Sequence, residues 1–217
     1  EHSFPTRRSS DLTTVYGFVR SHDAFLQNIQ ILEYDREIEV ENVTQHLFVP
    51  KDESTFSGEL QKIVRSDPDI LVLPEVRDKE TMQLATKAAA EKAKVYVGFN
   101  ADNVFDALRK WTALVGDKGL VAKGLVMITN QRLVRVLCSE CKERYKPDPG
   151  MLRKLNMPPE AMLHRPPEPT YDKRGNLIVC QACQGTGYVG RTGVFEALIV
   201  DDEVRRVIRA AGSISEV

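Results

Sequence analysis

Residues 66–81 read Ser-Asp-Pro-Asp-Ile-Leu-Val-Leu-Pro-Glu-Val-Arg-Asp-Lys-Glu-Thr, and this stretch decides the fold class. Four consecutive aliphatic residues, Ile70 to Leu73, lie between Asp-Pro-Asp and Pro-Glu, which is typical of a short strand buried on both faces of a parallel sheet. Glu75 follows the carboxyl end of that strand. Asp78 is the expected N-cap of the next helix, because Met82 and Ala85 follow at helical spacing. The stretch therefore predicts an α/β fold.

Glu75 has two interpretations on spacing alone. Open α/β sheets place ligands at the carboxyl ends of their strands. A carboxylate there can hold Mg²⁺ through water, or orient the water that attacks the γ-phosphate of a nucleoside triphosphate. The alternative is a loop carboxylate that only caps the following helix, because acidic residues are common at strand ends in this fold class.

Composition indicates an ordinary globular chain. The 217 residues are 42% hydrophobic and 28% charged, enough for one full core and a small appendage. Lys+Arg 30 against Asp+Glu 31 gives a formal net charge of -1, so the overall balance does not favour nucleic acid or an anionic membrane. We find neither an apolar run approaching the roughly 18 residues needed to span a bilayer nor a signal peptide, and expect a cytoplasmic location.

The cysteines form two Cys-x-x-Cys pairs, Cys138 with Cys141 and Cys180 with Cys183, and none is left over. Each pair lies on a tight turn that directs two sulfurs to one side, so four thiolates can surround one Zn²⁺ ion. The alternative is reduced or disulfide-linked pairs, which a cytosolic chain disfavours. The 38 residues between the pairs predict an insertion between two zinc knuckles.

The run from Asp67 to Thr81 resembles the Walker B region of the secretion ATPases that drive type II secretion and type IV pilus assembly. Members of that family are hexameric motors with a RecA-like core. Gln131 to Lys142, around the first cysteine pair, resembles the start of the family's zinc-binding subdomain. Cys180 to Glu196 resembles its end. The resemblance extends over residues 13–217 and implies an incomplete RecA-like P-loop NTPase core, a tetracysteine zinc-binding subdomain and a helical tail.

The resemblance also assigns roles to acidic residues. Glu75 corresponds to the catalytic glutamate, and Arg77 is the arginine beside it. Glu33 and Glu37 fall in the family's acidic box, which positions metal and water. Asp69 is placed with Arg77 in the vicinity of the nucleotide. The alternative for Glu33 and Glu37 is a solvated face, because carboxylates continue to alternate at Glu39 and Glu41 as on the exposed side of an edge strand.

Three departures from the family pattern weigh against an active site in the chain as it stands. The sequence contains no Gly-x-x-x-x-Gly-Lys-Ser/Thr, so we expect it to bind ATP poorly or not at all, and expect Mg-ATP only for a complete protein. Pro74 stands where the family has glycine. The histidine box is replaced by residues 98–102, Gly-Phe-Asn-Ala-Asp, which cannot titrate near neutral pH as imidazole does. The last two departures favour a diverged relative.

We divide the chain into four regions. Residues 1–12 resemble a translated sequencing adapter and are expected to be a non-native disordered arm, a true flexible N-terminus being the alternative. Residues 13–130 are the partial ATPase domain, 131–200 the zinc-binding subdomain and 201–217 the start of a C-terminal helical region. Within the ATPase domain, helices are expected to begin with the caps Ser57 and Asp102.

The first functional hypothesis is the C-terminal part of a hexameric ATPase that couples ATP hydrolysis to protein export or pilus assembly. By resemblance its partners are further copies of itself and an inner-membrane platform protein, so it is peripheral to the inner membrane. The second hypothesis is an inactive assembly subunit with structural zinc. The third is a zinc-binding adaptor that contacts nucleic acid, which the acidic residues Glu140 and Glu143 among the basic ones disfavour.

Overall fold

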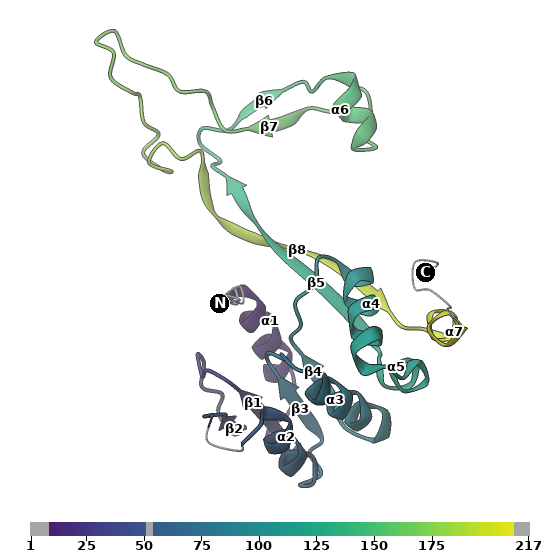
Figure 1. Cartoon of the computed structure of the whole chain (residues 1–217). Coiled ribbons are helices and arrows are strands. Elements are labelled where there is room, and N and C mark those ends of the chain that lie inside the picture. The colour runs from purple at the N-terminus through teal and green to yellow at the C-terminus, as the bar shows by residue number, and fades with distance from the viewer. Residues whose placement is uncertain (1–8, 51–53, 211–217) are drawn as a thin grey trace. The chain divides into compact units, whose positions relative to one another are not determined.

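The computed structural model describes residues 9–50 and 54–210 (Figure 1). The helices are α1 (Ser9–Arg20), α2 (Phe56–Val64), α3 (Lys79–Glu91), α4 (Val104–Val115), α5 (Lys118–Gly124), α6 (Pro149–Lys154) and α7 (Asp202–Ala210). The strands are β1 (Ile29–Glu33), β2 (Thr44–Leu47), β3 (Ile70–Leu73), β4 (Lys94–Val97), β5 (Met127–Leu137), β6 (Glu143–Tyr145), β7 (Leu163–Arg165) and β8 (Tyr188–Ile199).

These elements divide into two compact units. The larger unit comprises the described residues up to Gln131 and those from Phe195 onward, and the smaller unit is Arg132–Val194. The strands β5 and β8 form a two-stranded sheet and carry the chain from one unit to the other and back. The smaller unit therefore lies inside the region 131–200 that the sequence suggested for zinc binding.

A four-stranded parallel sheet organises the larger unit, with the strand order β2-β1-β3-β4. Gln30 of β1 lies between Thr44 of β2 and Leu71 of β3, and Leu73 pairs with Val97 of β4. All four strands run in the same direction, so their carboxyl ends meet at one edge. The predicted α/β class and the strand at Ile70–Leu73 are confirmed.

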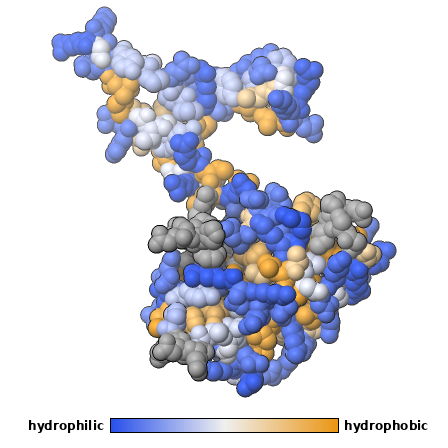
Figure 2. Space-filling view, in the orientation of Figure 1, coloured by the Kyte–Doolittle hydropathy of each residue, from blue (hydrophilic) through white to orange (hydrophobic). Residues whose placement is uncertain are grey.

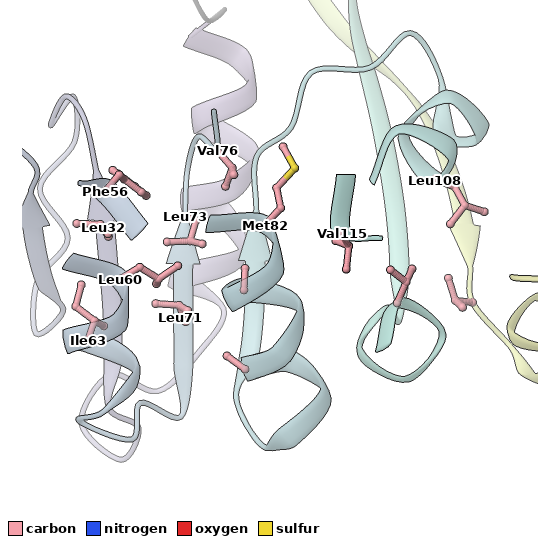
Figure 3. Packing of buried hydrophobic residues seen from close by; sticks show 14 of the residues in the cluster. Leu32, Phe56, Leu60, Ile63, Leu71, Leu73, Val76, Met82, Leu108 and Val115 are labelled. Carbon is pink, nitrogen blue, oxygen red and sulfur yellow. The ribbon is translucent and has the colours of Figure 1, made fainter. Parts of the chain in front are cut away.

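Alternation along β1 and β3 separates the core into two layers. Ile31 and Val72 face Tyr16 and Val19 of α1, whereas the residues next to them face the opposite side. There Leu71 and Leu73 point toward α2 and α3, as Figure 3 shows. Every residue of both strands is buried, because helices cover both faces of the sheet. In the face of the larger unit seen in Figure 2, apolar residues are interspersed with hydrophilic ones.

The helix caps confirm one expectation and correct two. Asp78 caps α3, its Oδ1 accepting a hydrogen bond from the Thr81 backbone N–H at 2.7 Å. The cap of α2 is Thr55 and not Ser57, which is buried within the helix and donates to Glu80 at 3.0 Å. The cap of α4 is Asn103 and not Asp102. In both cases a nearby residue that also favours the N-cap takes the position, so sequence preference alone does not identify the cap.

The N-terminal helix includes part of the expected disordered arm. Helix α1 is Ser9–Arg20, and the chain then turns, with the Ser21 N–H donating to the Phe18 carbonyl at 3.1 Å. Residues 9–12 of the expected disordered arm thus belong to α1, and residues 1–8 lie outside the described part of the chain. Among the described residues, none of the helices combines the length and apolar character needed to cross a bilayer.

The smaller unit contains an antiparallel pair, β6 with β7, and the short helix α6. Asp148 caps α6, and Leu152 is the buried residue of this helix. A second, looser hairpin follows, in which Tyr171 and Leu177 form an isolated antiparallel bridge. These elements occupy most of the chain between the two cysteine pairs, where the sequence predicted an insertion.

The doubly covered strand β3 yields a stability prediction. Leu71 is fully buried, so Leu71→Ala removes core contacts and leaves a cavity, and should lower the free energy of unfolding by about 2–5 kcal/mol. Chemical denaturation followed by circular dichroism measures this. The same substitution at Leu114, which is 37% exposed on α4, is the control and should have little effect. Equal losses at both positions would contradict a core centred on β3.

Candidate functional site

Glu75 and Arg77 form a two-point ion pair just beyond the carboxyl end of β3. Arg77 Nε lies 2.8 Å from Glu75 Oε1, and Arg77 Nη2 lies 3.1 Å from Glu75 Oε2. The hydrogen bond to Glu75 raises the pKa of Arg77. The Glu75 side chain keeps 29% of its surface exposed, so both carboxylate oxygens are engaged by arginine while the group still borders solvent.

Tyr34 completes this group from the neighbouring strand. It follows β1, its ring is stacked on Phe56 with centroids 4.4 Å apart, and the Arg77 Cζ lies 4.0 Å from its centroid. Burial, helped by the Asp78 charge and opposed by the Arg77 charge, raises the pKa of Tyr34 to about 12. The phenol is therefore neutral at physiological pH. From the sequence we assigned roles to Glu33 and Glu37 and none to Tyr34, although an aromatic residue directly after a buried strand was a usable signal.

Glu33 reaches the same edge of the sheet but faces the other side. Its carboxylate accepts hydrogen bonds from the Tyr16 hydroxyl, from Gln45 Nε2 at 3.1 Å and from Arg36 Nε at 3.4 Å. Only 2% of its side chain is exposed. Glu33 continues the alternation of Ile29 and Ile31 toward α1, so it is held in a buried network while Glu37 is exposed on the following connection.

Asp69 is separated from Glu75 by the length of β3. It precedes Ile70, the first residue of the strand, whereas Glu75 follows the last. Its Oδ2 accepts a hydrogen bond from the Asn28 backbone N–H at 2.8 Å, just before β1 begins. Asp69 thus lies at the amino edge of the sheet, and the structure brings together Glu75, Arg77 and Tyr34 but not Asp69.

The last part of the edge is the end of β4. The Gly98 N–H donates to the Leu73 carbonyl at 2.9 Å, and the Gly98 carbonyl accepts from the Val76 N–H at 3.2 Å. These hydrogen bonds extend the pairing of β3 with β4 beyond the ends of the two strands. They fix Gly98 beside the segment that contains Glu75. Asn100, the amide that follows, is exposed. The edge therefore presents a carboxylate, a guanidinium and an amide.

The four cysteines converge in the smaller unit. Their Sγ atoms all lie within 4.8 Å of one another, and those of Cys141 and Cys183 are 3.6 Å apart. All four are free thiols, so the disulfide alternative does not describe this structure. A tetrahedral zinc ion with bonds of about 2.3 Å requires sulfurs about 3.8 Å apart, so the donor set and its spacing fit such an ion. The sequence placed these four residues together correctly.

Gly187 connects the two cysteine pairs. Its N–H lies 3.3 Å from Cys183 Sγ, and its carbonyl accepts a hydrogen bond from the Cys138 N–H at 2.9 Å. Burial acts to raise the pKa of Cys183, but the Gly187 N–H and the neighbouring thiols outweigh it and lower the pKa to about 7. Burial raises the pKa of Cys141 to about 12. Backbone donors of this kind orient thiolate ligands around a metal.

Comparison with known proteins first defines the fold. The chain is similar to the ADP-bound pilus retraction motor PilT, with a TM-score of 0.56 and 18% identity over 91% of this chain and 46% of that one. It is also similar to the ATPase DotB of Yersinia pseudotuberculosis, with a TM-score of 0.57 and 14% identity over 98% of this chain and 46% of that one. These likenesses show that the α/β sheet shares the fold of PilT and of the ATPase DotB.

Sequence comparison then defines the family. The family described as "Type II/IV secretion system protein" matches residues 8–217, so this chain belongs to the Type II/IV secretion system protein family. It is 34% identical to the type IV pilus assembly ATPase PilB of Thermus thermophilus over 88% of this chain and 21% of PilB. It is 31% identical to the type II secretion system protein E of Pectobacterium carotovorum subsp. carotovorum over 92% of this chain. The chain spans 38% of that relative's length.

The contacts of Gly187 predict its role in the cysteine cluster. An added Cβ would lie 2.5 Å from Pro166 Cβ, and the residue has a φ of +75. Gly187→Ala should therefore lower both the capacity of the four cysteines to bind a metal ion and the free energy of unfolding, the latter by more than the roughly 1–3 kcal/mol typical of backbone strain alone. Gly190→Ala is a matched control, because φ is +73 and an added Cβ meets nothing within 4 Å. Metal analysis and denaturation measure both variants; equal effects would contradict the prediction.

Proposed function

We propose that the chain is the C-terminal part of a hexameric ATPase that couples ATP hydrolysis to protein export or pilus assembly. In this proposal the larger unit is an incomplete RecA-like core and the smaller unit is a zinc-binding subdomain. The observation that carries the proposal is the position of Glu75 at the carboxyl edge of a parallel sheet, in a chain of this family. That edge is where such sheets bind nucleotides.

Each residue of the edge has a proposed part in hydrolysis. Glu75 orients the water for in-line attack on the γ-phosphate of Mg-ATP, and Arg77 sets the position of its carboxylate. Glu37, which is exposed, would help to hold the Mg²⁺ ion of Mg-ATP. Glu33 supports the edge from within its hydrogen-bond network. Asp69 is not given a part, because it lies at the other end of β3.

The proposed partners follow from the family. ATP would bind between copies of the complete protein, and an inner-membrane platform protein would receive the force. The location proposed is the cytoplasm, peripheral to the inner membrane. Support comes from relatives that are named as a type IV pilus assembly ATPase and as type II secretion system protein E.

A second candidate is an assembly subunit that keeps the fold but does not hydrolyse ATP. Three observations favour it. Pro74, buried before Glu75, stiffens a position where the family has glycine. Asn100 stands in place of the histidine box. The Glu75 carboxylate has both oxygens on Arg77 and would have to release one to orient a water.

The test of hydrolysis uses the complete product of the source gene. Sequencing upstream of Thr13 should reveal an in-frame Gly-x-x-x-x-Gly-Lys-Ser/Thr, the loop that holds the β- and γ-phosphates. Glu75→Gln in that protein should lower ATP turnover by about 10²–10⁴-fold, the usual contribution of a positioned general base. Glu59→Gln, on the surface of α2, is the control and should retain activity. Undiminished turnover in Glu75→Gln would exclude the proposed role, and no turnover in the unaltered protein would favour the assembly subunit.

The zinc proposal can be tested on the chain itself. Metal analysis should find about one Zn²⁺ per chain, bound by Cys138, Cys141, Cys180 and Cys183. Changing either cysteine pair to serine should abolish binding together with the folded structure of the smaller unit, because structural zinc supplies folding free energy. His164→Ala, an exposed residue outside the cluster, should bind zinc normally. A smaller unit that stays folded without zinc would contradict the proposal.

A further inference from the structure

We propose that Tyr34 is a positioning residue, whose ring face holds the Arg77 guanidinium in its two-point pair with Glu75. The inference rests on the proposed function for its meaning, because Glu75 is there the catalytic glutamate. The structural part of the inference, that the Tyr34 ring stabilises the ion pair of Arg77 with Glu75, depends only on contacts among the described residues. Tyr34 thereby determines how often the Glu75 oxygens are available.

The ion pair needs such a support. The Arg77 and Glu75 side chains are 43% and 29% exposed, and a single residue, Val76, separates them along the chain. An exposed pair of this kind gains little by itself, because water screens the charges and two side chains lose rotational freedom. A second surface that fixes the guanidinium reduces that entropic loss. The Tyr34 ring is that surface, with the Arg77 Cζ 4.0 Å from its centroid.

The contact has the geometry of a cation–π interaction. Cations within about 6 Å of an aromatic centroid are attracted by the negative ring face, and arginine most often takes this position. The guanidinium is planar, so it can lie on the ring while its edge donates two hydrogen bonds to a carboxylate. Arg77 makes both interactions at once: its Cζ lies over the Tyr34 ring, and its Nε and Nη2 donate to the two Glu75 oxygens.

The Tyr34 ring is itself restrained by neighbouring aromatic rings, so it offers Arg77 a fixed surface. Its ring is stacked on Phe56 at an interplanar angle of 17° and meets the edge of Phe48 at a centroid distance of 5.7 Å. Phe48 and Phe56 are buried in the core of the larger unit. Through Tyr34, the position of the Arg77 side chain therefore depends on the packed sheet and α2 and not only on the segment that follows β3.

Any ligand of the Glu75 carboxylate must compete with Arg77 for its oxygens. A water or a metal that approaches the carboxylate must displace an arginine N–H, and the Tyr34 contact makes that displacement harder. Removing the ring face should free Arg77 and expose the carboxylate. A phenylalanine ring should preserve the contact, because the face and not the hydroxyl touches the guanidinium.

Nuclear magnetic resonance of the full chain tests this without any nucleotide. Arg77 Nε–H should resonate upfield, because the Tyr34 ring shields nuclei above its face, and Arg77→Lys identifies the signal. In Tyr34→Leu the upfield shift should disappear and the exchange of this proton with water should become about two- to fivefold faster, the factor expected for losing an exposed cation–π contact. Tyr34→Phe should restore both values. Tyr171→Leu, an exposed tyrosine in the smaller unit, should change neither.

An unchanged Arg77 signal in Tyr34→Leu would overturn the inference, as would loss of the signal's shift in Tyr34→Phe. Should Tyr34→Leu fail to fold, the unaltered chain still decides the question. It must show nuclear Overhauser effects between the Tyr34 ring and the Arg77 side chain, and their absence would also overturn the inference. Neither result depends on ATP turnover, so failure here and failure of the proposed hydrolysis are separate outcomes.

Discussion

Burial of β3 on both faces is the constraint on which the larger unit depends. Four aliphatic residues can be enclosed only if a neighbouring strand pairs on each side and helices cover above and below. In this chain a parallel sheet meets the requirement, with connections that return the chain over its faces. The chain then leaves β3 at the carboxyl edge of the sheet, where the polar residues Glu75, Arg77 and Asp78 follow.

The same alternation decides which polar groups meet at that edge. Consecutive residues in a strand point to opposite sides, so Glu33 joins the α1 side and Tyr34 the α2 side although they are adjacent in sequence. Glu33 is enclosed by hydrogen-bond donors, which satisfy a buried carboxylate. Tyr34 instead presents an apolar ring to Arg77. Adjacent residues thus have different roles: Glu33 belongs to a buried hydrogen-bond network, and Tyr34 belongs to the candidate site.

Sequence could predict features that depend on local pattern and on fixed chemical spacing. The strand of Ile70–Leu73, the Asp78 cap and the convergence of four cysteines belong to this class, because hydrophobic runs, capping preferences and thiol pairs act over a few residues. Sequence could not predict the contact of Tyr34 with Arg77, which depends on two strands in register. Nor could it distinguish Thr55 from Ser57 as a cap, since both offer the same hydroxyl.

The cysteine cluster also sets how freely the smaller unit can vary. The segment between Cys141 and Cys180 is a loop of 38 residues whose ends are held together at the sulfurs. The entropy lost on closing a loop grows only with the logarithm of its length, by about 0.6 kcal/mol for each doubling. Lengthening or shortening this segment is therefore thermodynamically cheap. Because the four cysteines hold the two ends of this segment together, insertions between Cys141 and Cys180 can accumulate without altering the arrangement around β3.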